Sequence, residues 1–389
     1  MPVKICAVTS TRADYGILSP LLKKLREDDF FDFTLAATGT HLSDAYGHTV
    51  EEILRDGFRP VLLPILKGEI RNATDVSRVM AESLLQFSAF FAEREFDLLL
   101  VLGDRYEIAA ICCAAVNCRL PIAHLHGGET TEGAIDECYR HAITKMSWLH
   151  FPAAEAYRRR IIQLGEDPER VFNVGALAVE NIREAADYPL EKLAEETGLP
   201  LREKNYAVVT FHPVTQEEGT AEGQMRALLE AMDGRRDLLY LITKSNADEG
   251  GGRINAIWDE YGAERENCRV VSSLGMRRYL SAVKHSLMAL GNSSSGILEA
   301  PVCGVPTVNI GERQKGRLRA GTVIDCRPER DDILAAMNEA ERRARQGMKP
   351  DPLFGDGTTS ERILRILKEK MTEKPDLKKK FLDLPGMPE

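Results

Sequence analysis

The sequence predicts an α/β protein built from two doubly wound parallel sheets that face a cleft. Short apolar segments alternate with segments of helical periodicity, which is the pattern of parallel strands joined by helices. Residues 98–102 (LLLVL) form an uninterrupted apolar run, as expected for a parallel strand covered on both faces. The alternation restarts after residues 198–200 (GLP), so two similar halves with a cleft between them are expected.

Strands and helices alternate throughout the first half. Apolar runs predict strands at Val3–Thr9, Phe33–Ala37, Pro60–Leu66, Phe96–Leu102, Pro121–Leu125, His150–Phe151 and Val171–Gly175. Apolar residues at helical spacing predict helices near residues 17–25, 75–93, 108–117, 137–148 and 155–164. Loops after the carboxyl ends of such strands form the functional edge of the sheet.

The second half repeats this pattern after a charged connecting helix, Leu190–Thr197. Strands are expected at Tyr206–Phe211, Leu238–Thr243, Arg269–Ser272, Ser286–Leu290 and Thr307–Ile310, and helices at Gly223–Met232, Met276–Lys284 and from about Glu361. The predicted domains are residues 1–178 on the sugar side and 179–367 on the nucleotide side, followed by a loose charged tail, 368–389.

Composition limits the classes of partner. The 389 residues carry a net charge of −9, which argues against nucleic acid or an anionic membrane but is compatible with a small anionic ligand. No signal-peptide core and no membrane-length apolar window is found, so a cytoplasmic protein is expected. The eight cysteines show no paired spacing and are expected to be buried free thiols.

Several polar residues of the first half directly follow predicted strands. Arg12, His41, Asp104 and residues 124–129 do so, and they should therefore converge on one edge of the sheet. Arg12 and Arg105 are well placed to bind a phosphate, although solvated surface arginines are the alternative.

The stretch 124–145 (HLHGGETTEGAIDECYRHAITK) is dense in histidines and acids. Asp104, Glu129, Asp136 and Glu137 are expected to share a pocket, where like charges raise one another's pKa and supply an acid and a base. Helix capping is the alternative for the last two. His126 could serve acid–base chemistry, fill the core, or bind a metal with His124; we expect no metal.

A small-residue loop in the second half suggests an anion site. Residues 291–296 (GNSSSG) lie between a strand and a helix, where backbone N–H groups and the helix dipole attract phosphate. An ordinary serine-rich N-cap is the alternative. Five cationic residues follow by position 327, and Glu299 could bind a ribose diol or lie on the surface. No GxGxxG follows the first strand and no GxxxxGK[ST] occurs, so nicotinamide and ATP cofactors are not expected.

These residues resemble the hydrolysing UDP-N-acetylglucosamine 2-epimerases of sialic and legionaminic acid synthesis, which include the epimerase half of the animal bifunctional epimerase/kinase. The matching strings lie in order between about positions 3 and 365: TRADYG (11–16), TGTHLSDAYG (38–47), GDRYE (103–107), HLHGGETTEGAIDE (124–137), RHAITKMS (140–147), FHPVT (211–215), GNSSSGILEAP (291–301) and GERQKGR (311–317). The resemblance implies two Rossmann-like domains of the glycosyltransferase-B type, with a UDP-sugar in the cleft.

The resemblance also implies roles for individual residues. The UDP would be held by Arg12, Ser293, Ser294, Glu299, Arg313 and Arg317, and the substrate also contacted by Asp14, His41 and Arg105. Asp104, Asp136, Glu137 and His212 would surround the sugar. Some relatives have HxEGGE where His126 stands, so the base is unassigned among Asp104, His126, Glu129 and Asp136.

The implied reaction converts UDP-GlcNAc to ManNAc and UDP through 2-acetamidoglucal, without a redox cofactor. Alternatives are the same chemistry on UDP-2,4-diacetamido-2,4,6-trideoxyhexose or GDP-GlcNAc, a non-hydrolysing epimerase, and a catalytically silent UDP-sugar sensor. A glycosyltransferase would need an acceptor-binding cleft, whereas this one is rich in carboxylates. The resemblance further implies a homo-oligomer, either a dimer or a tetramer.

Overall fold

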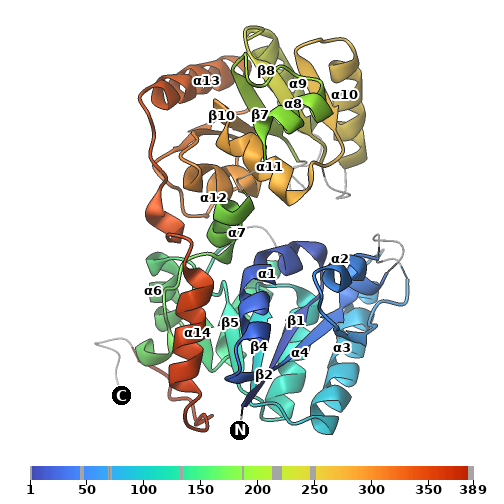
Figure 1. Ribbon diagram of the computed structural model, residues 1–389, viewed down its shortest axis with the longest axis vertical. Helices are drawn as coiled ribbons and strands as arrows, with labels where there is room; N and C mark the ends of the chain where they lie inside the picture. Colours follow the sequence, from blue (N-terminus) through green and yellow to red (C-terminus); the bar gives the residue numbers. More distant parts are fainter. Residues whose placement is uncertain are drawn as a thin grey trace. The chain divides into compact units, whose positions relative to one another are not determined.

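The computed structural model describes residues 2–43, 48–68, 70, 72–131, 135–185, 188–212, 221–245 and 251–383. The chain divides into two compact units. Each unit contains a parallel six-stranded sheet with helices packed on both faces (Figure 1). The predicted α/β fold class with two Rossmann-like domains is therefore confirmed.

The first sheet has the strand order β3-β2-β1-β4-β5-β6. Its strands are β1 (Val3–Thr9), β2 (Phe31–Thr38), β3 (Val61–Leu63), β4 (Leu98–Leu102), β5 (Ile122–Leu125) and β6 (Leu149–Phe151). All neighbouring pairs are parallel. The winding direction reverses between β1 and β4, and in such sheets the loops at this reversal form the ligand site.

Helices cover both faces of this sheet. They are α1 (Arg12–Glu27), α2 (Val50–Arg55), α3 (Ala73–Glu93), α4 (Tyr106–Asn117), α5 (Asp136–Met146), α6 (Glu155–Gln163) and α14 (Thr359–Lys370). Alternate residues of β4 pack into opposite cores: Leu98 and Leu100 into the core that contains residues of α1 and α14, Leu99 and Val101 into the core of α3 and α4. This double burial explains the uninterrupted apolar run.

The second sheet has the strand order β12-β11-β10-β7-β8-β9. Its strands are β7 (Tyr206–Thr210), β8 (Leu239–Thr243), β9 (Cys268–Val271), β10 (Met288–Gly291), β11 (Thr307–Ile310) and β12 (Val323–Cys326). The accompanying helices are α8 (Leu190–Thr197), α9 (Ala221–Asp233), α10 (Gly251–Ala263), α11 (Gly275–Lys284), α12 (Ser294–Val302) and α13 (Arg330–Arg345). The helix α7 (Leu177–Ala185) carries the chain from the first unit into the second.

The last helix differs from the sequence prediction. The chain enters the second unit after Glu180 but returns to the first at Gly355, so α14 does not belong to the 179–367 domain proposed from the sequence. The reason is its apolar face: Ile363 and Leu367 are fully buried in the core of the first unit, where α14 packs against α1. In the sequence this helix follows the second half directly, so its return to the first unit could not be predicted from order alone.

Several further elements were predicted incorrectly or missed, among them the helices α2, α7 and α10, for which no helix was expected. Residues 171–175 form no strand; Val171 makes only an isolated bridge to His150. The strand β12 and the helix α13 were not predicted, because half-exposed β12 lacks a continuous apolar run and α13 is dominated by charge. The predicted burial of all cysteines is also wrong, since Cys113, Cys118 and Cys138 are exposed. No described helix has the length and hydrophobicity needed to span a bilayer.

Candidate functional site

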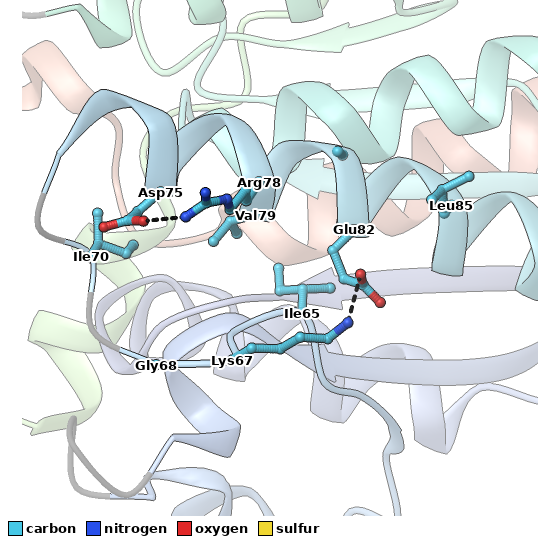
Figure 2. A pocket seen from close by; sticks show the side chains of 10 residues that line it. Ile65, Lys67, Gly68, Ile70, Asp75, Arg78, Val79, Glu82 and Leu85 are labelled. Atoms are coloured by element: carbon cyan, nitrogen blue, oxygen red, sulfur yellow. Dashed lines mark hydrogen bonds and ion pairs between the residues drawn. The ribbon is translucent and has the colours of Figure 1, made fainter.

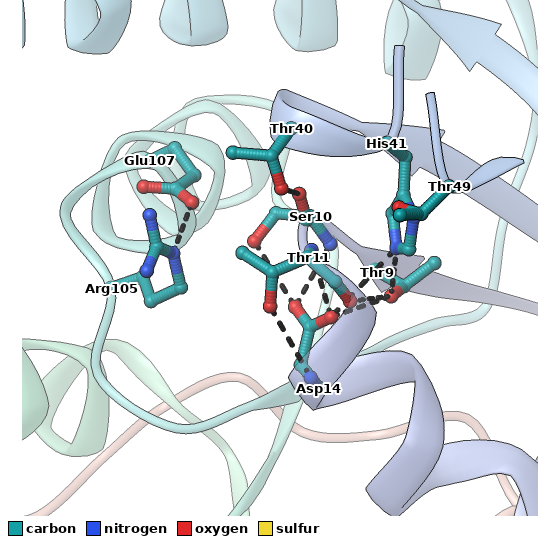
Figure 3. Close-up of polar contacts among 9 residues, drawn as sticks. All are labelled: Thr9, Ser10, Thr11, Asp14, Thr40, His41, Thr49, Arg105 and Glu107. Atoms are coloured by element: carbon teal, nitrogen blue, oxygen red, sulfur yellow. Dashed lines mark hydrogen bonds and ion pairs between the residues drawn. The ribbon is translucent and has the colours of Figure 1, made fainter. Parts of the chain in front are cut away.

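The turn from β1 into α1 is organised around the carboxylate of Asp14 (Figure 3). Its two oxygens accept hydrogen bonds from the Thr9 hydroxyl at 2.8 Å, the Ser10 N–H and hydroxyl at 2.9 and 3.1 Å, and the Thr11 N–H at 2.8 Å. Thr11 caps α1 in return by accepting from the Asp14 N–H. Asp14 therefore shapes the turn, and its predicted contact with substrate stays a prediction.

His41 joins the loop after β2 to the same turn. The His41 Nε2 lies 2.9 Å from the Thr9 hydroxyl, and its Nδ1 lies 2.8 Å from the Thr49 hydroxyl (Figure 3). Burial lowers the pKa of this fully buried imidazole, although Asp14 opposes the shift. Gly39 is required here because its φ is +59° and a Cβ would lie 2.6 Å from the Ser10 carbonyl oxygen. The two strand ends are thus locked together.

The two arginines proposed as phosphate ligands have different surroundings. Arg12 is exposed and its Nε lies 3.0 Å from Glu52. Arg105 donates to Glu107 at the start of α4 (Figure 3). Burial opposes the charge of Arg105, but Glu107 outweighs it, so the pKa of Arg105 is raised. Glu107, which was not among the predicted site residues, is 2% exposed and has a buried oxygen without a hydrogen-bond partner.

A buried arginine joins two of the predicted catalytic carboxylates. Arg140 of α5, 4% exposed, donates through Nη2 to Asp104 and through Nη1 to Glu137 at 3.1 Å. Glu137 also lies 3.0 Å from His141 Nε2. Asp104 and Glu137 keep about a quarter of their side chains exposed, at 24% and 26%. Arg140 was not among the predicted site residues, although its i,i+3 spacing from Glu137 favours an ion pair on one helix face.

His126 and Glu129 form a second pair at the end of β5. The His126 Nδ1 lies 2.8 Å from Glu129 Oε1, whereas its Nε2 is buried without a hydrogen-bond partner. His126 adopts φ +61°, which is unusual for a residue with a Cβ and is typical of functional loops. A Cβ at Gly127 would lie 2.9 Å from His124 Nδ1, so glycine permits this close approach. The backbone is therefore strained at His126, and the contact with Glu129 orients its ring.

Burial shifts the pKa values of His124 and Asp136 in opposite directions, and in both cases it favours the neutral form. The fully buried His124 lies with Nε2 2.8 Å from the Gly103 carbonyl oxygen, and burial lowers its pKa to about 3. It is therefore a neutral structural histidine at neutral pH, and both of its ring nitrogens are occupied, since Nδ1 lies 3.3 Å from the Thr144 hydroxyl. Burial raises the pKa of Asp136, at the start of α5, and Arg105 offsets this only in part. Asp136 is thus protonated more readily than an ordinary aspartic acid.

The predicted anion loop of the second unit lies at the end of β10. Gly291 has φ +133°, and a Cβ there would lie 2.0 Å from the Thr210 carbonyl oxygen, so no other residue fits. The Ser293 hydroxyl caps α12 by accepting from the Ser295 N–H at 3.3 Å, and Ser294 is exposed at the first turn. The serine-rich N-cap, considered as the alternative to an anion site, is therefore present.

Asn292 is the hub of this loop and was missed from the sequence. Its side-chain oxygen accepts from the His212 N–H at 2.7 Å, and its side-chain NH2 donates to the His212 carbonyl at 2.9 Å. The backbone carbonyl of Asn292 accepts from the side chains of Arg313 and Gln314 at 3.1 and 3.0 Å. The His212 Nδ1 lies 3.1 Å from the Ser245 hydroxyl. Residues 213–215 of the predicted FHPVT loop lie outside the described residues, as do 44–47 of the TGTHLSDAYG segment.

Glu299 lies within the same unit, one turn into α12. One of its oxygens is buried without a hydrogen-bond partner. Burial raises the pKa of Glu299, and Ser295 and Arg317 oppose the shift only in part. A buried, underused carboxylate of this kind suits a diol, whose two hydroxyls can donate to it. The second unit thus brings together Ser293, Arg313 and His212 around Asn292. The charge of Arg317 acts on Glu299 and partly offsets the rise in its pKa.

A separate pocket of about 490 Å³ lies between α3 and the loop after β3 (Figure 2). Its charged lining is paired within itself: Lys67 with Glu82 at 3.0 Å and Arg78 with Asp75 at 3.1 Å. None of the predicted site residues lines it. In the described part of the chain, no group of three or more His, Cys, Asp or Glu side chains could hold a metal ion.

Comparison with known proteins identifies relatives over the full length. Residues 23–368 match the family described as UDP-N-acetylglucosamine 2-epimerase. Polysialic acid biosynthesis protein P7 of Escherichia coli is 36% identical over 386 residues, 98% of each chain. GDP/UDP-N,N'-diacetylbacillosamine 2-epimerase (hydrolyzing) of Campylobacter jejuni is 37% identical over 347 residues, 87% of this chain and 88% of its own. The structure of Neisseria meningitidis UDP-GlcNAc 2-epimerase bound to UDP-GlcNAc has the same fold, with a TM-score of 0.81 and 15% identity over 94% of this chain and 100% of that chain.

Proposed function

Because the chain belongs to the UDP-N-acetylglucosamine 2-epimerase family, we propose that it is a hydrolysing nucleotide-sugar 2-epimerase that acts on a UDP-2,4-diacetamido-2,4,6-trideoxyhexose. The Campylobacter relative, at 37% identity, bears the name of a hydrolysing epimerase for such a sugar. This similarity favours the diacetamido sugar over UDP-GlcNAc, the first substrate predicted from the sequence.

The observation that best supports the chemistry is the Arg140 cluster. Asp104 and Glu137 are held by one buried guanidinium, yet about a quarter of each side chain is exposed. A fixed, partly accessible carboxylate pair beside Asp136, whose pKa is raised by burial, offers both a proton acceptor and a proton donor. A purely structural cluster would have no need of the exposed edge.

In the proposed reaction, a base of the first unit removes the proton at C2 while the C1–O bond to UDP breaks. The electron pair forms the C1=C2 double bond of a 2-acetamidoglycal. Water then adds at C1 and a proton returns to the opposite face of C2, giving the free 2-epimer and UDP. The C1–O electron pair leaves with UDP, and neither step needs an external oxidant or reductant.

The second unit would bind the leaving group. The α12 amino end with Ser293 and Ser294, together with Arg313 and Arg317, can stabilise charge that develops on the diphosphate as C1–O breaks. Glu299 can accept from the ribose hydroxyls. His212 would contact the sugar, and Arg12 and Arg105 of the first unit would contact phosphate.

The base stays unassigned among Asp104, the His126–Glu129 pair and Asp136. Asp136 is the better proton donor because burial raises its pKa. Asp104 is fixed by Arg140, and 24% of its side chain is exposed, so it is held in place with an edge open to a ligand. We therefore place Asp104 first among the candidates for the base.

Incubation in D2O with UDP-2,4-diacetamido-2,4,6-trideoxyhexose and, separately, with UDP-GlcNAc tests the proposal by NMR. We expect release of UDP and a free 2-epimer deuterated at C2, with the higher kcat/KM on the diacetamido sugar. A product that keeps its C1–UDP bond would instead identify a non-hydrolysing epimerase. Binding of UDP without turnover of either sugar would contradict the proposal and support the sensor.

UDP-GlcNAc is the second candidate substrate, because the matched family bears its name. It would yield ManNAc and UDP by the same two steps. A higher kcat/KM on UDP-GlcNAc in the paired assay would favour it and would leave the proposed chemistry unchanged. The predicted dimer or tetramer also stays a prediction, which sedimentation can test.

A further inference from the structure

The C-terminal segment 372–383 packs against the first unit and is not the loose tail expected from the sequence. The Leu382 N–H donates to the Gly165 carbonyl at 3.0 Å. The Phe381 ring covers Gly165 so closely that a Cβ there would lie 2.6 Å from it. The Lys145 Nζ atom lies 4.8 Å from the centre of the same ring. The segment therefore has a defined docking place next to the end of α5.

The ammonium group of Lys379 is the central contact of this segment. It donates to the carbonyl of Lys145 at 2.8 Å, to the carbonyl of Ser147 at 2.7 Å, and lies 2.6 Å from Glu166 Oε2. An ammonium has three N–H donors and no acceptor. The three oxygens therefore match the full donor capacity of one primary ammonium group.

Without Lys379 these three oxygens would form a site rich in acceptors and short of donors. The Lys145 and Ser147 carbonyls belong to the last turn and C-cap of α5, where helix carbonyls lack partners within the helix and the dipole is negative. Glu166 is 1% exposed and is shared with Lys145 Nζ at 2.6 Å and His150 Nε2 at 3.1 Å. Leaving such oxygens buried without a donor is costly.

We propose that Glu166 and the carboxyl end of α5 form a binding site for a primary ammonium group, and that Lys379 fills this site as a ligand tethered to the C-terminal segment. The assignment does not depend on the proposed catalytic function. Lys145 alone cannot serve the site, because its ammonium already donates to Glu166 Oε1 and to the Leu164 carbonyl at 3.0 Å. The segment thus binds through one specific cation and one aromatic ring.

Chemical rescue of Lys379→Ala tests this proposal in the full chain. The substitution should lower the Tm by about 4 °C or more, since it leaves a buried carboxylate and two carbonyls short of a donor. Propylammonium chloride, which restores the three N–H donors and most of the stem, should recover at least half of that loss. Tetramethylammonium chloride at the same concentration has the charge but no N–H donor, and should not.

Lys380→Ala is the matched control, because Lys380 is exposed in the same segment and the change in charge is identical. Its Tm should stay within about 1 °C of the wild type and should not respond specifically to propylammonium. Equal Tm values for Lys379→Ala and Lys380→Ala would overturn the proposal. So would a loss in Lys379→Ala that propylammonium does not reverse.

If Lys379→Ala does not fold, Lys379→Met keeps the proposal testable, since it retains the aliphatic stem and removes only the ammonium. It should release the segment to trypsin, with cleavage after Lys378 or Lys380 faster than in the wild type. Cleavage at the wild-type rate would mean that stem packing holds the segment and would contradict the ammonium site.

Discussion

The two ends of α5 carry two ionic clusters that differ in charge balance and in accessibility. At the amino end, Arg140 holds Asp104 and Glu137. At the carboxyl end, Glu166 is held by Lys145 and Lys379. The first cluster has one cation for two carboxylates that are about a quarter exposed, whereas the second has two cations for one carboxylate that is 1% exposed.

This difference separates a cluster that can act on a ligand from one that stabilises the fold. At the amino end, the carboxylates outnumber the cation and are partly exposed, so they can accept a proton from a ligand or a hydrogen bond from its hydroxyl groups. At the carboxyl end, both Glu166 oxygens are already occupied by donors of the chain.

The largest expected effect is on turnover, from Asp104→Asn. The isosteric amide cannot accept a proton as a carboxylate does, so kcat should fall by about 10²–10⁴-fold. The Tm should change little, because the amide oxygen can still accept from Arg140. UDP affinity, measured by calorimetry, should be retained. Turnover near that of the wild type would remove Asp104 from the chemistry and leave His126 or Asp136 as the base.

Glu166→Gln should show the opposite pattern. Removal of the buried charge leaves Lys145 and Lys379 facing each other, which should cost about 3 kcal/mol in the free energy of unfolding. The kcat of the folded fraction should stay within about threefold of the wild type, since Glu166 is placed outside the proposed chemistry. Denaturant titration and steady-state kinetics measure both quantities. A loss of kcat without a loss of stability would contradict the division between the two clusters.

Much of the first unit was predictable because parallel strands have a strong apolar signature. The β4 run and the polar residues directly after strand ends predicted the sheet and the loops that carry Asp104 and His126. Local periodicity also predicted α5 and α6 to within about two residues. These features depend on neighbours in the sequence.

Contacts distant in the sequence could not be predicted in the same way. Arg140 and Asp104 are 36 residues apart, and their pairing depends on how α5 packs beside β4 and β5. Lys379 and Ser147 are 232 residues apart, and the charged tail gave no apolar signal of docking. The return of α14 to the first unit creates that second contact, since it carries the tail with it. A single sequence read locally therefore places a polar residue in a loop but does not identify its partner.

A smaller effect is expected on the pH dependence of stability, because the contribution of Glu166 to the free energy of unfolding is lost gradually in acid. The hydrogen bonds from His150, Lys145 and Lys379 outweigh burial and lower the pKa of Glu166 to about 2. The unfolded chain takes up this proton near the ordinary glutamate pKa of 4.5. The contribution of Glu166 is therefore complete above pH 4.5 and is lost as the pH falls from 4.5 toward 2. Urea titrations between pH 6 and about 3 should show a flatter decline for Glu166→Gln than for the wild type. Parallel declines would show that Glu166 is not held ionised by these partners.

The smallest expected effect tests the aromatic half of the docking place, through Gly165→Ala. Gly165 has φ +86°, so alanine should cost about 1 kcal/mol from backbone strain alone. The new Cβ also displaces the Phe381 ring, which is 64% exposed and can swing into solvent. Gly347→Ala is the control for strain, because Gly347 has φ +76° and open space around its Cβ. We expect Gly165→Ala to be the more destabilising of the two and to speed tryptic cleavage after Lys378 or Lys380, whereas Gly347→Ala should leave cleavage unchanged. In a Phe381→Ala background the two glycine substitutions should cost the same, and a persistent excess for Gly165→Ala would show that Phe381 does not anchor the segment.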